Sequence, residues 1–304
     1  MIQHLIDGVL TGSYISLGAI GLTLVMHILR FANFSHAELL SLGAYTALVF
    51  DALVSALVPV FADKLAPLSL TTALIIAIPL AMLLTGASAL VIDRIVFRRV
   101  RDKGHELSMF FASFGMALVI RNLIGLTFGL GPQLYSRDIA FAMVLSRDPL
   151  ILVKPDQVFV LVAALILMLI LHLVLSRTTF GYALRAVAEN PALAQVNGVN
   201  LSRTIMFVWL IGGALAAVAG VFYGLSHQVI PVMGRDLVLP IFAATIVGGI
   251  GSVYGAVLGG FLVGIAANLA LVVLPSGYTP SVPFLIILAV LLLRPNGLFG
   301  EARA

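Results

Sequence analysis

The sequence predicts an all-α, polytopic integral membrane protein with roughly eight to ten transmembrane helices, some of them broken or re-entrant. Its 304 residues are 61% hydrophobic and only 10% charged, whereas charged residues make up about a quarter of a soluble domain. Apolar runs of about 20 residues, the length that crosses a bilayer, recur along the chain. Lys and Arg gather beside alternate runs, as membrane orientation requires.

The apolar runs follow one another with short polar connections. They cover 4–29, 37–60, 70–92, 107–130, 157–175, 204–225, 236–250, 254–274 and 281–293. The run 236–250 is short and bounded by glycine, which favours a half-helix or one arm of a re-entrant pair. We expect residues 1–304 to form a single transmembrane domain, because bundled spans share one unit.

The distribution of basic residues predicts the orientation. If the N-terminus lies outside, Arg30, the basic run Arg94–Arg101 and the basic residues of 176–203 all fall inside, together with the C-terminal end. This is the positive-inside arrangement. The basic residues therefore mark orientation, and the net charge of +4 does not suggest a nucleic-acid partner.

Residues 176–203 form the longest polar segment on the predicted inner side. The composition of Tyr182–Glu189 predicts a short helix, with Arg185 and Glu189 away from its apolar face. Asn190 and Pro191 suit the N-cap and first position of a second short helix, and Gly198 suits a left-handed stop after it. Ser202 is expected to cap the next span. We interpret this segment as a surface offered to a partner; the alternative is a well-capped loop without one.

A second polar stretch, RFANFSHAE, leads into the second apolar run. Its residues Asn33, Ser35, His36 and Glu38 lie at a membrane boundary and are candidates for a gate or a translocation path. The alternative is structural, because Ser35 and Glu38 have the spacing of a capping box. The two interpretations are compatible.

Arg121 lies about fifteen residues into the fourth run, in the outer half of the bilayer. One hypothesis is that its guanidinium contacts the carboxylate of a transported amino acid. Two alternatives compete with it. The side chain could snorkel to the external headgroups, or it could pair with polar groups of a neighbouring helix, helped by Asn122.

A glycine-rich stretch, GGIGSVYGAVLGG, occupies 248–260. Its first glycines, Gly248, Gly249 and Gly251, indicate a turn or unwound segment, and Ser252 is expected to cap the helix that follows. The remaining candidates are Gly255 and Gly259, whose four-residue spacing is typical of close helix approach in lipid. We expect this stretch to act in hinge motion or in helix contacts.

The sequence predicts that this chain catalyses no chemical reaction itself. A Walker A motif is absent from the sequence, so any ATP hydrolysis belongs to another subunit. The six histidines show no metal-ligand spacing, and the absence of cysteine excludes thiolate sites. Carboxylates within the apolar runs are few, which counts against an ion-coupled carrier.

Three stretches resemble the permease subunit of the branched-chain amino-acid ABC importers. They are NFSHAE followed by LLSLGAY, GYALRAVAENPALAQVNGVN, and IVGGIGSVYGAVLGG. The sequence departs from the family pattern with Ser35 for Ala, Ala37 for Gly, and an arginine at position 121. The resemblance covers nearly the whole chain in order, including the basic stretch RIVFRRVR.

The resemblance implies a multi-pass protein of the bacterial inner membrane that moves branched-chain or related amino acids inward by alternating access. It implies two cytoplasmic ATPase subunits that use ATP and Mg, a second homologous permease and a periplasmic binding protein. It also implies that Arg185–Gly198 docks on an ATPase. The alternatives are a permease for urea, amides or other small solutes, an ion-coupled secondary carrier, and a membrane scaffold without a pathway.

Overall fold

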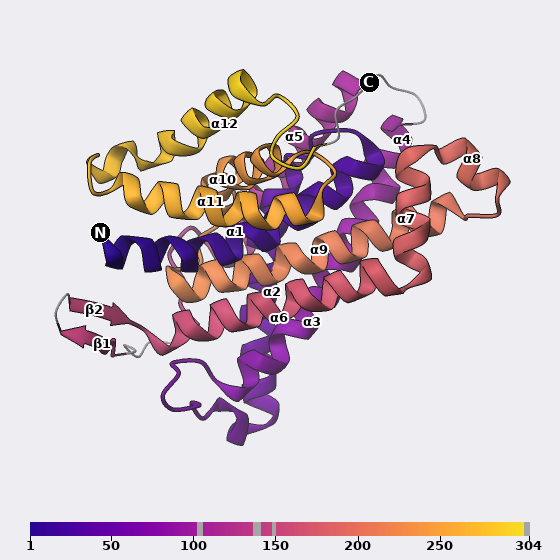
Figure 1. Ribbon diagram of the computed structural model, residues 1–304. Coiled ribbons are helices and arrows are strands. Elements are labelled where there is room, and N and C mark those ends of the chain that lie inside the picture. Colours follow the sequence, from indigo (N-terminus) through magenta and orange to yellow (C-terminus); the bar gives the residue numbers. More distant parts are fainter. Residues whose placement is uncertain (102–105, 136–140, 148–149, 301–304) are drawn as a thin grey trace.

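The computed structural model describes residues 1–101, 106–135, 141–147 and 150–300 (Figure 1). The first half of the chain forms α1 (Ile2–Leu29), α2 (Ser35–Leu57), η1 (Pro59–Ala62), α3 (Thr72–Ile92), the π-helical turn η2 (Asp93–Phe97), α4 (Arg98–Arg101), α5 (Glu106–Phe128), β1 (Met143–Arg147) and β2 (Leu150–Val153). The second half forms α6 (Pro155–Arg177), α7 (Thr179–Glu189), α8 (Pro191–Val196), α9 (Leu201–Ser226), α10 (Met233–Gly248), α11 (Val253–Ala270), η3 (Ser276–Ser281) and α12 (Val282–Leu293).

Eight helical stretches in the described part of the chain are long and apolar enough to cross a membrane. This agrees with the lower bound of the predicted number. The sequence did not predict the antiparallel hairpin of β1 and β2, which occupies the long connection before α6. Its strands have only five and four residues, so the bundle remains helical in class.

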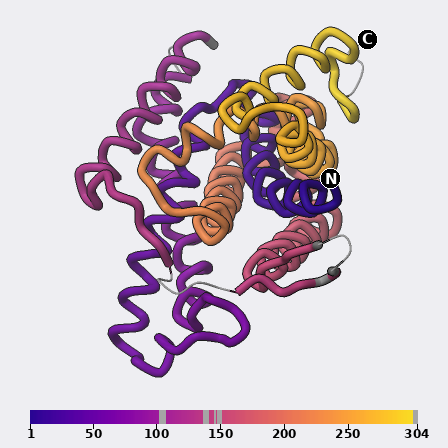
Figure 2. Tube along the Cα trace, turned by 90° about the vertical axis from the view of Figure 1, so that its left-hand side faces the viewer, coloured from indigo at the N-terminus to yellow at the C-terminus, as the bar shows by residue number. Residues whose placement is uncertain are grey.

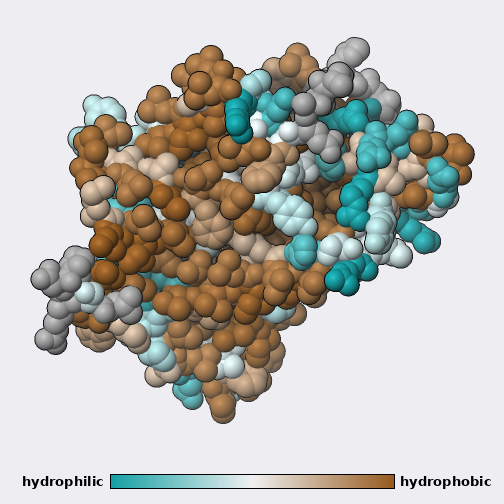
Figure 3. All heavy atoms as spheres, viewed as in Figure 1, coloured by the Kyte–Doolittle hydropathy of each residue, from teal (hydrophilic) through white to brown (hydrophobic). Residues whose placement is uncertain are grey.

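The centre of the bundle is formed by α1, α2, α9 and α10 (Figure 2). Every residue of α1 from Gly12 to Val25 is buried. A helix that is apolar or small on every side is expected at the centre of a bundle. Outer helices such as α6 instead expose Leu, Ile and Val. Figure 3 shows this apolar surface across the middle of the molecule.

Small residues let α1 and α11 approach backbone to backbone. A Cβ added at Gly12 would lie 2.7 Å from Phe261 Cα, and one added at Gly264 would lie 2.4 Å from the Gly12 nitrogen. Glycine is therefore required on both helices at this crossing. The four-residue glycine spacing reflects contact within the chain, as expected for a membrane bundle.

The helix α10 begins inside the bundle. Its sixteen residues span about 24 Å, less than a hydrocarbon core of about 30 Å. Met233, its first residue, is fully buried, and Gly234 lies against Ala37 and Glu38 of α2. The preceding chain reaches this depth as an extended segment in which Val229 pairs with Gln133. This short helix agrees with the prediction for 236–250 of a half-helix or one arm of a re-entrant pair.

The two ends of the bundle differ in composition. At one end lie α4, α7 and α8, and at the other lie the N-terminus and the β1–β2 hairpin (Figure 1). Arg30, just after α1, donates from Nη2 to the Ala188 carbonyl at 3.2 Å, which fixes the end of α1 beside α7. Hydrophilic residues gather at this α7–α8 end (Figure 3).

Candidate functional site

The polar segment before α9 folds into two short helices, as predicted, and α8 has a side-chain N-cap where α7 has none. The Asn190 carboxamide oxygen accepts from the Leu193 amide at 3.0 Å, and Pro191 begins α8. Gly198 follows with φ +84°, and the next amide, of Val199, donates to the Ala194 carbonyl at 2.9 Å. This is the left-handed helix stop that favours glycine. The prediction that Ser202 caps α9 is wrong, because the Asn200 carboxamide oxygen accepts from the Arg203 amide at 3.0 Å instead.

The helix α7 is fastened to the end of α6. Leu184 and Val187 are buried on its inner face, and a Cβ added at Gly181 would lie only 1.9 Å from the Leu175 carbonyl oxygen. Arg185 Nη1 donates to the same carbonyl at 2.9 Å, with its guanidinium 4.8 Å from the centre of the Tyr182 ring. Arg185 thus has a structural role that its predicted docking role did not include.

The outer side of this segment exposes apolar side chains. Tyr182 is 62% exposed, Leu193 59% and Val196 86%. Figure 3 shows brown spheres at the outer tip of the molecule, over α8, among hydrophilic neighbours. Apolar residues gathered at the polar end of a membrane bundle are typical of interaction surfaces. Glu189 is also exposed there and forms no ion pair with any described residue.

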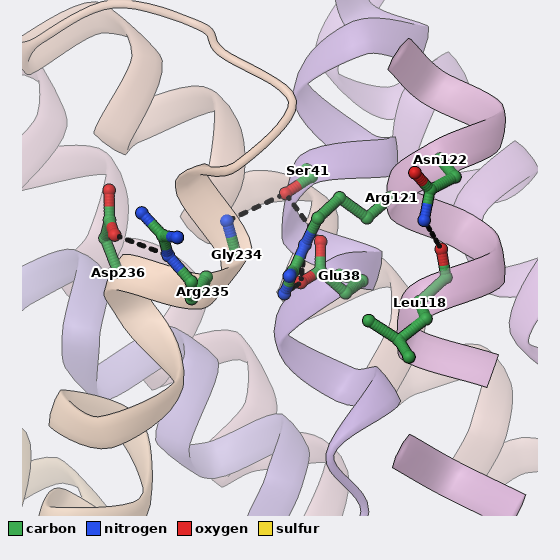
Figure 4. A network of polar contacts seen from close by, with 8 residues as sticks. All are labelled: Glu38, Ser41, Leu118, Arg121, Asn122, Gly234, Arg235 and Asp236. Carbon is green, nitrogen blue, oxygen red and sulfur yellow. Dashed lines mark hydrogen bonds and ion pairs between the residues drawn. The ribbon is translucent and has the colours of Figure 1, made fainter. Parts of the chain in front are cut away.

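A second feature is an ion pair inside the bundle (Figure 4). Arg121 of α5 donates from Nε to Glu38 Oε1 at 3.0 Å, and its Nη2 contacts the same oxygen. The Glu38 side chain is 2% exposed and that of Arg121 is 24% exposed. The Ser41 hydroxyl lies 3.5 Å from Glu38 Oε2 and accepts from the Gly234 amide at 2.9 Å. The network therefore joins α2, α5 and the buried start of α10.

The capping-box interpretation of Ser35 and Glu38 is wrong. The helix α2 begins at Ser35 itself, so Phe34 is the N-cap and provides no side-chain cap. The side chain that accepts hydrogen bonds at the start of α2 is that of Asn33. Its Oδ1 accepts from the Ser35 amide at 3.2 Å and from the Ser35 hydroxyl at 2.7 Å. The Glu38 carboxylate cannot reach back to the helix start, since the guanidinium of Arg121 holds it.

The other gate candidates lie within the bundle. Asn33 and His36 are buried, and His36 Nε2 is 3.1 Å from the Gly18 carbonyl. Asn33 Nδ2 and His36 Nδ1 have no hydrogen-bond partner in the described part of the chain. A buried polar atom without a partner is costly and requires an explanation. A gate at Asn33, Ser35, His36 and Glu38 stays a prediction.

Of the three hypotheses for Arg121, the structure shows the pairing with a neighbouring helix. Its guanidinium reaches Glu38 and does not snorkel outward. Asn122 does not assist, because its Nδ2 donates to Leu118 of its own helix at 2.7 Å (Figure 4). Contact between Arg121 and a substrate stays a prediction.

The glycine-rich stretch forms a tight corner between α10 and α11. Gly249 and Gly251 both have φ +99°, and the Ser252 hydroxyl accepts from the Gly255 amide at 3.0 Å, as predicted. A Cβ at Gly255 would lie 2.0 Å from the Gly248 carbonyl oxygen, and one at Gly259 would lie 2.1 Å from that of Ala244. These contacts favour helix contact over hinge motion.

The corner is also covered by the end of the chain. The Leu298 amide donates to the Val247 carbonyl at 2.8 Å, and the Phe299 amide donates to that of Gly248 at 3.1 Å. Within the described ranges, no group of three or more His, Cys, Asp or Glu residues could hold a metal ion.

Comparison with known proteins identifies the family. Residues 4–293 match the family described as "Branched-chain amino acid transport system / permease component". The chain belongs to this family. It is therefore a multi-pass, all-α membrane permease, and not a member of an enzyme family.

The permease has relatives with transport names. It is 31% identical to the "High-affinity branched-chain amino acid transport system permease protein LivH" of Salmonella typhimurium, over 99% of this chain and 96% of that protein. It is 30% identical to the corresponding protein BraD of Pseudomonas aeruginosa, over the same shares. Identity to the "Autoinducer 2 import system permease protein LsrC" of Klebsiella pneumoniae is 37%, over 39% of this chain and 37% of that protein. No solved structure matches.

Sequence reasoning missed three residues of these features. Gly181 sets the corner between α6 and α7, Ser41 connects Glu38 to α10, and Asn200 caps α9. The cap at Asn200 could have been predicted from the sequence, because Asn is as good an N-cap as Ser. Nothing local distinguishes Ser41 or Gly181, since their partners come from other helices.

Proposed function

We propose that this permease is the membrane subunit of an ATP-binding-cassette importer that carries branched-chain or closely related amino acids inward. The names of the two relatives that align over nearly the full chain support this substrate class. Family membership also disfavours the ion-coupled carrier and the scaffold without a pathway. Urea, amides and other small solutes remain substrates to be compared in the test.

The proposal includes the partners of such an importer. They are two cytoplasmic ATPase subunits, which use ATP and Mg, a second homologous permease and a periplasmic binding protein. The N-terminus lies outside and the C-terminus in the cytoplasm of a bacterial inner membrane. The position of Arg30 beside α7, at the end that also carries α4, supports this orientation through the positive-inside rule.

The apolar outer surface of α7 and α8 is the observation that supports docking of the ATPase subunits. An amphipathic pair of short helices with exposed Leu193 and Val196 suits a groove on another protein. Movement of the bound ATPase would pass to three spans. These are α6 through the Arg185–Leu175 bond, α1 through the Arg30–Ala188 bond, and α9 through the short connection after Gly198.

The test uses the whole complex with Leu193→Asp and Val196→Asp combined. Both side chains are exposed, so we expect the permease to fold and insert normally while the ATPase subunits are lost on affinity purification. Uptake of radiolabelled leucine into vesicles should fall with them. The matched control is Leu193→Met with Val196→Leu, which keeps the apolar surface and should keep the complex.

Two results would separate the parts of the proposal. A fully assembled and active complex carrying both aspartates would show that this surface does not dock the ATPases. If the intact complex takes up urea or acetamide and not leucine, isoleucine or valine, the substrate class is wrong although the docking surface stands.

A further inference from the structure

A basic cavity of about 280 Å³ lies at the α7–α8 end, between the α3–η2–α4 helix and the beginning of α9. Four arginines line it: Arg94, Arg98 and Arg101 from the first helix, and Arg203 from α9. Its acidic lining residue is Asp93. The ion pair of α2 and α5 and the exposed side of α8 do not involve these side chains.

The helix presents its arginines on one face by their spacing. Arg94, Arg98 and Arg101 follow at intervals of four and three residues, which places them in line along a helix. The opposite side of the helix is fixed in the core. There Phe97 is fully buried and stacks on Trp209 of α9, with the ring centres 5.3 Å apart and an angle of 4° between the ring planes. The π-helical turn Asp93–Phe97 lies at this point, and such turns occur frequently at functional sites. The buried aromatic pair holds the two walls of the cavity together.

The cavity holds uncompensated positive charge. Arg101 Nη1 lies 3.5 Å from Asp93 Oδ1, and both atoms are buried without a hydrogen-bond partner in the described residues. Within the same part of the chain, Arg94, Arg98 and Arg203 form no ion pair. Arginines held around a cavity repel one another unless an anion binds there. Their planar donor groups suit the oxygens of a phosphate.

The depth of the cavity indicates where that phosphate comes from. Arg94 lies 22 residues after the first residue of α3, which is about 33 Å along the helix. A hydrocarbon core is about 30 Å thick, so Arg94 reaches the level of the lipid headgroups. The other lining residues include apolar Leu90 and Met206, and polar Ser202. An apolar wall beside a basic one matches the junction of acyl chain and headgroup.

We propose that this cavity binds the phosphate of an anionic phospholipid from the adjoining leaflet. Basic pockets between transmembrane helices on the cytoplasmic side are known to take such headgroups. A bound phosphate would neutralise arginines from both walls and so tie the α3–α4 helix to α9. A free phosphate ion would contact the arginines in the same way, but it has no acyl chain to pack against the apolar wall.

The experiment measures lipid binding to the whole delipidated complex by native mass spectrometry. Phosphatidylglycerol is titrated against phosphatidylcholine, and inorganic phosphate is added as a soluble competitor. Phosphatidylglycerol should bind selectively. The double variant Arg98→Gln with Arg203→Gln should weaken it roughly thirtyfold, if each arginine contributes about what a basic residue near a charged membrane surface does.

The control is Arg99→Gln with Arg177→Gln, which removes the same charge from exposed positions outside the cavity. It should leave the affinity within about twofold. An equal loss in both doubles, or equal affinity for phosphatidylcholine, overturns the proposal. If inorganic phosphate displaces phosphatidylglycerol at concentrations as low as those at which the lipid itself binds, the site belongs to the free ion and the lipid proposal is overturned. If the Arg98/Arg203 double does not assemble, Arg203→Gln alone is measured, with a loss of about fivefold expected.

Discussion

Arg121 of α5 and Glu38 of α2 face each other inside the membrane bundle, with Arg121 Nε 3.0 Å from Glu38 Oε1 (Figure 4). They are 83 residues apart in the chain. A charged residue in a transmembrane segment is expensive, and pairing with an opposite charge is the usual means of tolerating it. Arg121 departs from the family pattern, and its ion pair with Glu38 explains how the bundle accommodates this charge.

The first prediction follows from this pair. Arg121→Gln or Glu38→Gln alone should destabilise the permease by about 2–4 kcal/mol, because each leaves an uncompensated charge among buried groups. The double variant should lose less than the sum of the two, since no lone charge remains. The measurement is the thermal stability of the complex in detergent for all three variants.

Arg235→Gln provides the control for that series. Among the described residues, the ion pair of Arg235 is with its neighbour Asp236, at 3.6 Å and with both side chains well exposed, so its loss should cost less than about 1 kcal/mol. Additive losses for Arg121 and Glu38 would contradict the coupling. Transport by a stable double variant also tests the substrate-contact hypothesis, because wild-type uptake without the guanidinium would exclude it.

The second prediction separates folding from docking within the cytoplasmic segment. Glu189→Lys should release the ATPase subunits while leaving the yield and stability of the permease unchanged, because Glu189 is exposed and makes no described ion pair. Arg185→Glu should also lower stability by about 1–3 kcal/mol, because it removes the bond to the Leu175 carbonyl. Size-exclusion chromatography of the complex reports docking, and thermal unfolding reports stability. Loss of stability in Glu189→Lys, or none in Arg185→Glu, would be inconsistent with these assignments.

The third prediction concerns the crossing of α10 and α11. Gly259→Ala should destabilise the bundle by about 1–3 kcal/mol or prevent assembly, since its Cβ would meet the Ala244 carbonyl oxygen at 2.1 Å. Gly255→Ala should do the same against the Gly248 carbonyl. Gly115→Ala in α5 is the matched control, because a Cβ there has no described atom within 4 Å. Equal yields of folded complex for all three variants would mean that α10 and α11 do not make this close contact.

The sequence predicted the features that depend on residues close together in the chain, namely spans, helix caps and the short helix α10. The spans follow from continuous apolar runs. The caps at Asn190, Gly198 and Ser252 follow from hydrogen bonds between groups three to five residues apart in the chain. The short helix α10 followed from the shortness of its apolar run. Each depends on length, composition or local spacing.

Local spacing also produced the clearest error. Ser35 and Glu38 have the pattern of a capping box, yet the carboxylate of Glu38 pairs with an arginine from another helix. An ion pair in a medium of low dielectric constant is stronger than a single bond to a helix-terminal amide. The tertiary partner therefore decided the role of Glu38, and no local pattern could reveal that partner.

By itself, the sequence determined that this protein is a helical membrane bundle with two short helices at its basic end, because hydropathy and capping are properties of short stretches. Only the tertiary structure decided which charges meet, where α10 begins and what Arg185 holds. It also decided that Arg203 completes a cavity with the arginines of η2 and α4. The physical reason is that these features depend on the distances between helices, and those distances are set by close contacts at glycine and small residues far apart in the chain.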